Sequence, residues 1–106
     1  PSDYSVDAAL REGLMDFGGG KTIKLRLRLS DERAVYLSET PLSEDQKIRH
    51  RNGEWELEAT VRDTWQLHFW ILSQASGIEV LRPVALRRLI RDRLQEALGN
   101  YNEEQK

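Results

Sequence analysis

The chain has 106 residues, which suffices for one domain with a single hydrophobic core. Hydrophobic residues make up 39% and charged residues 32%, a balance typical of a folded domain rather than a disordered chain. The formal net charge of −2 excludes a bulk attraction to nucleic acid or membranes, and the absence of cysteine excludes disulfides, thiolate nucleophiles and cysteine-rich metal sites. Because no signal peptide, transmembrane segment or lipidation motif occurs, we expect a cytoplasmic location, and Pro1 in place of an initiator methionine indicates a segment of a longer protein.

Residues 1–20 are predicted to form a lead helix followed by a glycine linker. The apolar residues of this segment recur at near-helical spacing, at Val6, Leu10, Leu14 and Phe17. Three glycines, residues 18–20, then end the helix. We interpret them as a linker and not as a phosphate-binding loop, because that loop follows a strand and precedes a helix, and here the order is reversed.

The next segment predicts a strand, a short helix and a hairpin. From Lys21 to Leu29 apolar and basic residues alternate, which is typical of a half-buried strand. Ser30 is a good N-cap for a helix that ends before Pro41. Two further alternating runs, residues 47–51 and 54–61, flank an Asn-Gly pair at 52–53, the preferred sequence of a type I′ hairpin turn.

The stretch from residue 63 to 88 predicts a buried helix, a short strand and a basic helix. Asp63 is expected to cap the first helix, with Gln66 bonding back to the cap. Gly77 is expected to take a left-handed conformation just past this helix, and Pro83 to start the next one. The last helix is predicted over about residues 85–98 and is closed by Gly99-Asn100, and residues 102–106 are expected to fray.

The order of these elements predicts an α+β domain over residues 21–101. Strand, helix, strand, strand, helix, strand is the ferredoxin-like βαββαβ plan, with an antiparallel sheet in the order 4-1-3-2 and helices on one face. This order alternates the charges on the open face of the sheet, strand by strand. Any order that placed the first two strands together would set two cationic rows side by side.

No enzymatic site is predicted, and neither a metal nor a cofactor is expected. The two histidines, His50 and His68, have no acidic or serine partner at a catalytic spacing, nor a second histidine at a metal-binding spacing. The acidic row on the third strand, Glu54, Glu56 and Glu58, lies between two cationic strands and is expected to be used in ion pairs.

Two sets of residues are candidates for binding. A basic helix face could contact an anion or nucleic acid, although a solvated helix face is the alternative interpretation; its residues are Arg82, Arg87, Arg88 and Arg91. Trp65 marks an interface if it is exposed, and otherwise covers the edge of the core. The charged sheet face supplies the other interface candidates, which are Lys24, Arg26, Arg28 and Arg49.

One family has this order of motifs. The central motif reads Leu67, Trp70-Ile71-Leu72-Ser73, Gly77-Ile78-Glu79-Val80-Leu81, Pro83 and Leu86-Arg87, and outlying matches are Pro41-Leu42-Ser43, Gln46, Gly53 and Tyr101. In this order the chain resembles the C-terminal extension (WCX) domain of bacterial WYL-domain transcriptional regulators. The chain itself has neither a Trp-Tyr-Leu triplet nor a helix-turn-helix pattern.

The resemblance implies a non-catalytic regulatory and dimerisation domain. It implies a homodimer, an upstream WYL core and DNA binding through other domains of the full-length chain, with this domain helping to transmit effector binding. The competing hypothesis is a stand-alone module of the same topology that senses a small anionic metabolite, which requires a concave pocket lined by arginines. Neither hypothesis involves a membrane.

Overall fold

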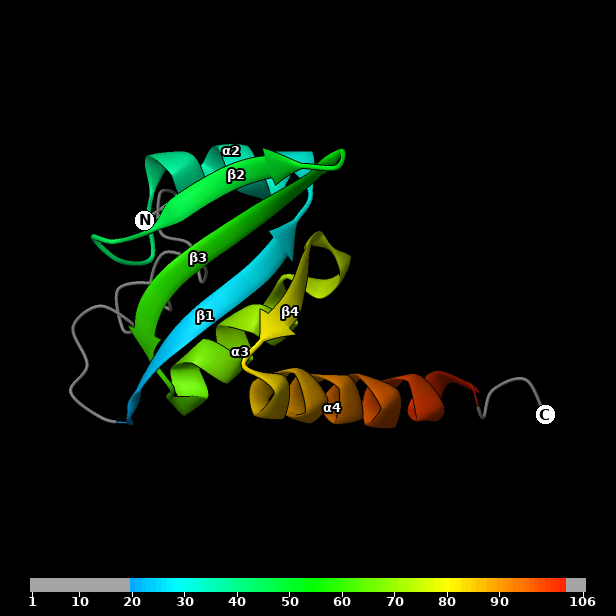
Figure 1. Ribbon diagram of the computed structural model, residues 1–106. Helices are drawn as coiled ribbons and strands as arrows, with labels where there is room; N and C mark the ends of the chain where they lie inside the picture. Colours follow the sequence, from blue (N-terminus) through cyan, green and yellow to red (C-terminus); the bar gives the residue numbers. More distant parts are fainter. Residues whose placement is uncertain (1–19, 103–106) are drawn as a thin grey trace, which may run out of the picture.

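The computed structural model describes residues 20–102, which form a four-stranded antiparallel sheet with three α-helices (Figure 1). The predicted lead helix of residues 1–19 and the tail of residues 103–106 lie outside the described residues. The elements are β1 (Thr22–Leu29), α2 (Asp31–Glu39), β2 (Lys47–Arg51), β3 (Glu54–Arg62), α3 (Trp65–Ser73), the 3₁₀ turn η1 (Ala75–Gly77), β4 (Ile78–Arg82) and α4 (Val84–Asn102).

The strands lie in the order β2-β3-β1-β4, which is the predicted order read from the opposite edge. In register, Leu27 of β1 lies between Leu57 of β3 and Val80 of β4. The α+β class and the antiparallel four-stranded sheet are therefore confirmed. The layout departs from a regular ferredoxin-like plan at β4, where the ladder with β1 shifts register between Arg26 and Leu27, and in the additional helix α4.

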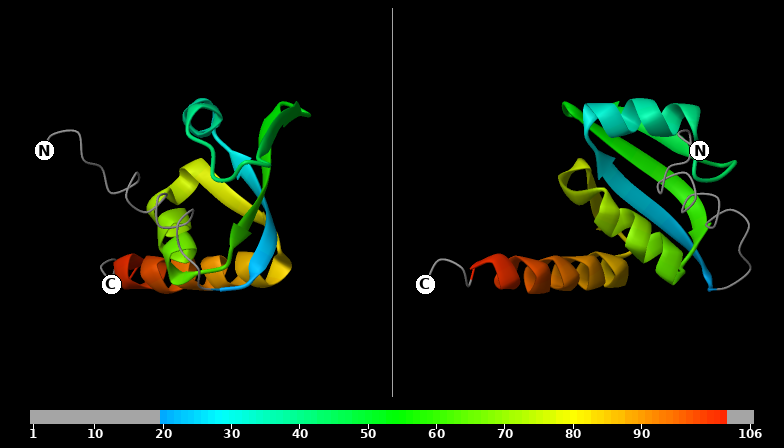
Figure 2. Two further views of the ribbon diagram at one scale, coloured as in Figure 1. Left: turned by 90° about the vertical axis from the view of Figure 1, so that its left-hand side faces the viewer. Right: turned by 180° about the vertical axis from the view of Figure 1, so that it is seen from behind.

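The core lies between the sheet and the helices. Leu25, Leu27 and Leu57 on the inner face of the sheet are fully buried, as is Leu67 of α3, and Trp70 is 1% exposed. Burial of each such side chain contributes about 1.5–3 kcal/mol. Figure 2 shows α2 and α3 on the same side of the sheet, so the opposite face, which carries the charged rows, stays open.

Local sequence signals are confirmed in the first half of the chain. The Ser30 hydroxyl caps α2 by accepting a hydrogen bond from the Arg33 backbone N–H at 3.3 Å. The hairpin turn has φ of 53° at Asn52 and 77° at Gly53, as a type I′ turn requires. Both features depend on neighbours within a few residues, which is why the sequence predicts them.

The predicted cap of α3 is wrong by one residue. Thr64, not Asp63, is the N-cap, and its hydroxyl accepts from the Leu67 backbone N–H at 3.2 Å. Gln66 does not complete a capping box, because its buried Oε1 accepts no hydrogen bond from the described residues. The cap position is only 7% exposed, and a hydroxyl loses less hydration on burial there than a carboxylate would.

The predicted role of Gly77 is also wrong. The left-handed residue after α3 is Ala75, with φ of 51°, and Gly77 ends the 3₁₀ turn that follows. A side chain there would be tightly packed, because a Cβ would lie 3.1 Å from Cγ of Arg33 and the arginine would have to shift. The Gly77 carbonyl also accepts from the Ser30 backbone N–H at 3.0 Å, which ties the start of β4 to the start of α2.

The last helix is longer than predicted and leaves the body of the domain. It runs through Gly99-Asn100 to Asn102, because one glycine costs a helix only about 1 kcal/mol and no described residue packs against this position. Leu86 and Ile90 are buried, whereas every residue from 91 to 102 is exposed. Figure 1 shows this outer half of α4 extending past the sheet.

Candidate interaction surfaces

The open face of the sheet is a network of ion pairs. Arg26 lies opposite Glu58 in the β1–β3 ladder and binds it at 2.7 Å. Arg28 lies opposite Glu56 but binds Glu54 at 2.6 Å and also contacts Glu79 of β4. The hydrogen bond from Arg26 lowers the pKa of the Glu58 carboxyl, and the same bond raises the pKa of Arg26. The predicted alternation of charge is therefore confirmed, because arginines of β1 form ion pairs with glutamates of both neighbouring strands, β3 and β4.

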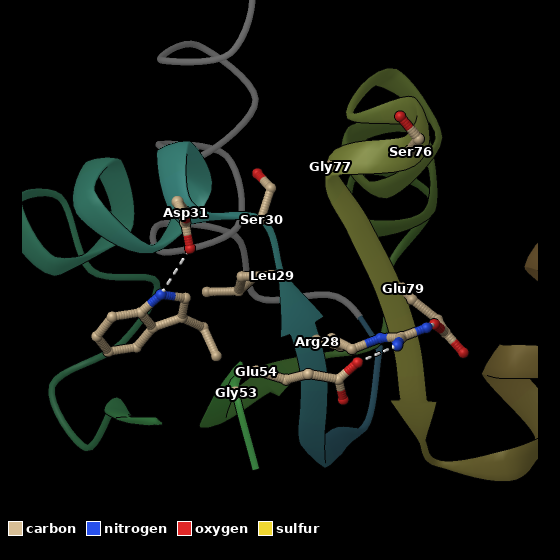
Figure 3. A pocket seen from close by; sticks show the side chains of 10 residues that line it. Arg28, Leu29, Ser30, Asp31, Gly53, Glu54, Ser76, Gly77 and Glu79 are labelled. Carbon is tan, nitrogen blue, oxygen red and sulfur yellow. Dashed lines mark hydrogen bonds and ion pairs between the residues drawn. The ribbon is translucent and has the colours of Figure 1, made fainter. Parts of the chain in front are cut away.

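Arg28 also stands at the edge of a polar hollow where β1, β4 and the β2–β3 turn meet (Figure 3). The volume is about 330 Å³. In this hollow Glu54 and Glu79 are paired with Arg28, and Asp31 accepts a hydrogen bond from the Trp55 indole at 2.9 Å. The three carboxylates that line it are therefore engaged in holding the sheet, the turn and α2 together.

The structure gives one histidine an acidic partner that the sequence analysis missed. His68 Nε2 lies 2.6 Å from Oδ1 of Asp63, five residues earlier in the chain. The sequence signal for this contact is the Asp63-Thr64 pair. Because Thr64 is the N-cap of α3, the Asp63 side chain can contact His68 near the start of the helix. His50 instead packs against Trp55, with ring centroids 4.4 Å apart. Within residues 20–102, no three His, Asp or Glu side chains gather as metal ligands would.

The four arginines of the predicted basic helix face do not form one group. Arg87 donates to Glu79 at 2.6 Å and to the Val80 carbonyl at 2.8 Å, so it fastens α4 to β4. Arg91 lies 3.3 Å from its neighbour Asp92, and Arg88 is exposed on the helix. Arg82 ends β4 and lines a different hollow from Arg87 and Arg91.

Arg82 joins a different set of cations. The register shift in β4 places it opposite Arg26, and the two arginines line a hollow of about 520 Å³ together with Lys24. Among residues 20–102, the acidic residue that lines this hollow is Glu58, which Arg26 already binds. The register shift that brings Arg82 opposite Arg26 has no local sequence signal.

Two helices, α3 and α4, each carry more than one exposed large apolar side chain. On α3, Trp65 is 67% exposed and Phe69, one turn later, is 51% exposed. Trp65 is thus an exposed residue, and its role in an interface stays a prediction. On α4, the stripe that begins at the buried Ile90 continues outward through Leu94, Leu98 and Tyr101, which are 46%, 58% and 69% exposed.

A family comparison agrees with the sequence motifs. The family model of the WCX domain matches residues 21–98. The chain belongs to the WCX domain family. The predicted resemblance is thereby confirmed. No curated protein matches the chain.

Two of the exposed apolar residues of α4, Leu94 and Leu98, lie beside the edge strand β4. β4 is an edge strand, and a groove of about 430 Å³ runs between it and α4. Ile78 and Val80 form one wall of the groove, and Ile90, Leu94 and Leu98 form the other. At the opposite edge, the candidate Arg49 is exposed on β2 and faces Glu56 across the ladder.

No helix within residues 20–102 is long and apolar enough to cross a bilayer.

Proposed function

We propose that this WCX domain is a non-catalytic regulatory and dimerisation domain of a WYL-type bacterial transcription regulator. It helps couple effector sensing to a DNA-binding domain elsewhere in a full-length cytoplasmic protein. Membership of the WCX family supports the regulatory role. The strand order β2-β3-β1-β4 supports the ferredoxin-like interpretation of its layout. The engagement of its charged residues in ion pairs supports the absence of catalysis.

The exposure of the apolar residues on the outer half of α4 is the main support for a dimerisation role. Residues 91–102 are all exposed, although Leu94, Leu98 and Tyr101 continue the apolar stripe of the buried half. A helix of this length is marginal in water on its own and takes most of its stability from a packed apolar face. A second copy of the same helix offers that face.

Charge favours an antiparallel arrangement of the two helices. The inner half of α4 is basic, with Arg87 and Arg88, and Arg91, Asp92 and Arg93 follow at the start of its outer half. Its outer half carries Glu96, and Glu103 and Glu104 follow in the sequence. In an antiparallel pair the basic part of each helix lies beside the acidic part of the other, which a parallel pair would not achieve. The β4 groove next to Leu94 then extends the contact.

The test is sedimentation equilibrium of the chain over a range of concentrations. We expect a dimer that is weakened in the double variant Leu94→Ala/Leu98→Ala. Each of the two leucines has roughly half of its surface exposed, and a dimer would bury that surface in both copies. Truncating both leucines in both copies should therefore lower the free energy of association by roughly 2–4 kcal/mol. That loss corresponds to a roughly 30- to 1,000-fold rise in Kd.

Val35→Ala is the matched control, since Val35 is 62% exposed but lies on α2. It should leave Kd unchanged. A wild-type chain that stays monomeric at the highest concentration, or a double variant that dimerises as well as the control, would refute dimerisation through α4.

Anion sensing is the second candidate function, and the Lys24–Arg26–Arg82 hollow favours it. Two arginines opposite each other across a ladder repel, and a bound anion relieves that repulsion. A ligand at 100 times its Kd stabilises the folded state by about 2.7 kcal/mol. We expect pyrophosphate to raise Tm, the effect to be lost in Arg82→Gln, and the effect to persist in Arg88→Gln. An equal loss in both variants would indicate non-specific screening.

A further inference from the structure

α3 is apolar on both of its sides. Leu67, Trp70 and Ile71 point into the core and are buried. On the outward side, Trp65 and Phe69 lie one turn apart and are 67% and 51% exposed. Helices that are hydrophobic all round are normally covered on all sides, and two adjacent exposed aromatics mark a contact surface.

The chain enters the sheet directly beside this surface. Gly20 lies against the residues that start α3, so closely that a Cβ on it would lie 2.2 Å from the Asp63 carbonyl oxygen and 3.1 Å from Cγ2 of Thr64. Lys21 fixes this approach, because its carbonyl accepts from the Asp63 backbone N–H at 2.8 Å. Trp65 follows Thr64 immediately. Whatever precedes Gly20 therefore begins next to the exposed aromatics.

The preceding sequence has the apolar pattern that such a surface needs. Val6, Leu10, Leu14 and Phe17 are spaced by four, four and three residues, which places them along one side of a helix. Phe17 is three residues from Gly20, and three residues span at most about 10 Å. Phe17 is therefore within reach of Trp65.

We propose that residues 6–17 of the same chain dock through these apolar residues onto the Trp65–Phe69 face of α3. The short connection favours the same chain over a second copy, because it holds the two surfaces together at an effective concentration in the millimolar range. The docked segment would shield the outward side of α3 and fix the direction in which the chain leaves the domain. This proposal is independent of dimerisation through α4.

The experiment compares two single substitutions in the full chain, each of which adds one negative charge. Leu14→Asp changes the predicted apolar side of the segment, and Ala8→Asp changes the opposite side. The readout is the set of indole N–H signals in a ¹⁵N-labelled sample, with the Trp65 signal identified by its loss in Trp65→Phe. Amide hydrogen exchange over residues 6–17 is measured in parallel.

We expect Leu14→Asp to shift the Trp65 signal and to leave the signal of the core residue Trp70 in place. Exchange over residues 6–17 should accelerate about tenfold or more, the factor that about 1.4 kcal/mol of lost docking energy produces. Ala8→Asp should change neither readout. If Leu14→Asp also shifts the Trp70 signal, the substitution has disturbed the fold. The same two readouts are then taken from the milder variant Leu14→Ala.

Two results would overturn the proposal. One is a Trp65 signal that is the same in the wild type, Leu14→Asp and Leu14→Ala. The other is a shift that appears at high concentration and vanishes on dilution, which would assign the surface to a second copy.

Discussion

Gly20 and Gly53 form a natural pair for separating backbone strain from steric contact. Both have positive φ, +76° and +77°, a region that L-residues with a side chain rarely adopt. A Cβ at Gly20 would lie 2.2 Å from a backbone oxygen, whereas a Cβ at Gly53 would meet no atom of the described residues within 4 Å. Substitution of each by alanine therefore imposes the same strain and a very different contact.

The strain should cost each variant about 1–2 kcal/mol of the free energy of unfolding. At Gly20 the contact is with backbone, so the chain has to move away. Such a movement breaks the hydrogen bond from the Asp63 N–H to the Lys21 carbonyl, and the one from Arg62 to the Gly20 carbonyl. Each of these contributes about 0.5–1.5 kcal/mol. Gly20→Ala should therefore cost roughly 1–3 kcal/mol more than Gly53→Ala.

Urea unfolding at one pH and temperature measures this difference. With a slope of about 2 kcal/mol per M, the midpoint of Gly20→Ala should fall roughly 0.5–1.5 M below that of Gly53→Ala. The smaller entropy of the unfolded alanine chain is common to both variants and cancels. Equal midpoints would show that the close approach of Gly20 to the start of α3 contributes nothing to stability.

Two further predictions concern a helix cap and acid stability. Thr64→Ala should cost about 0.5–2 kcal/mol in the same urea assay, and an unchanged midpoint would show that another residue caps α3. The hydrogen bond from Ser43, followed by those from Thr60, lowers the pKa of the Asp45 carboxyl. A lowered pKa adds stability above the pKa of the unfolded chain, and that stability is lost as the pH falls, here below about pH 5. Asp45→Asn should therefore flatten the fall in Tm between roughly pH 5 and 2, while Glu44→Gln, a change in the same loop, should keep the slope of the wild type.

The sequence by itself determined the elements whose causes are local. The alternation from Lys21 to Leu29 predicted β1 and its inner face, Ser30 predicted the start of α2, and Asn52-Gly53 predicted the hairpin turn. The strand order was also predictable, because alternating charged rows are stable in only a few arrangements. The motif order was sufficient for the family, since it needs only residue types and spacing.

Only the tertiary structure decided which side chains are buried and which groups meet across the sheet. Because the start of α3 is buried, Thr64 and not Asp63 is its N-cap, and Asp63 instead contacts His68. A register shift in β4 set Arg82 against Arg26, and the end of the sheet left Leu98 exposed although its spacing resembles that of a core residue. Each of these outcomes depends on contacts between residues far apart in the chain or on where the packed body ends, and a periodic pattern contains neither kind of information.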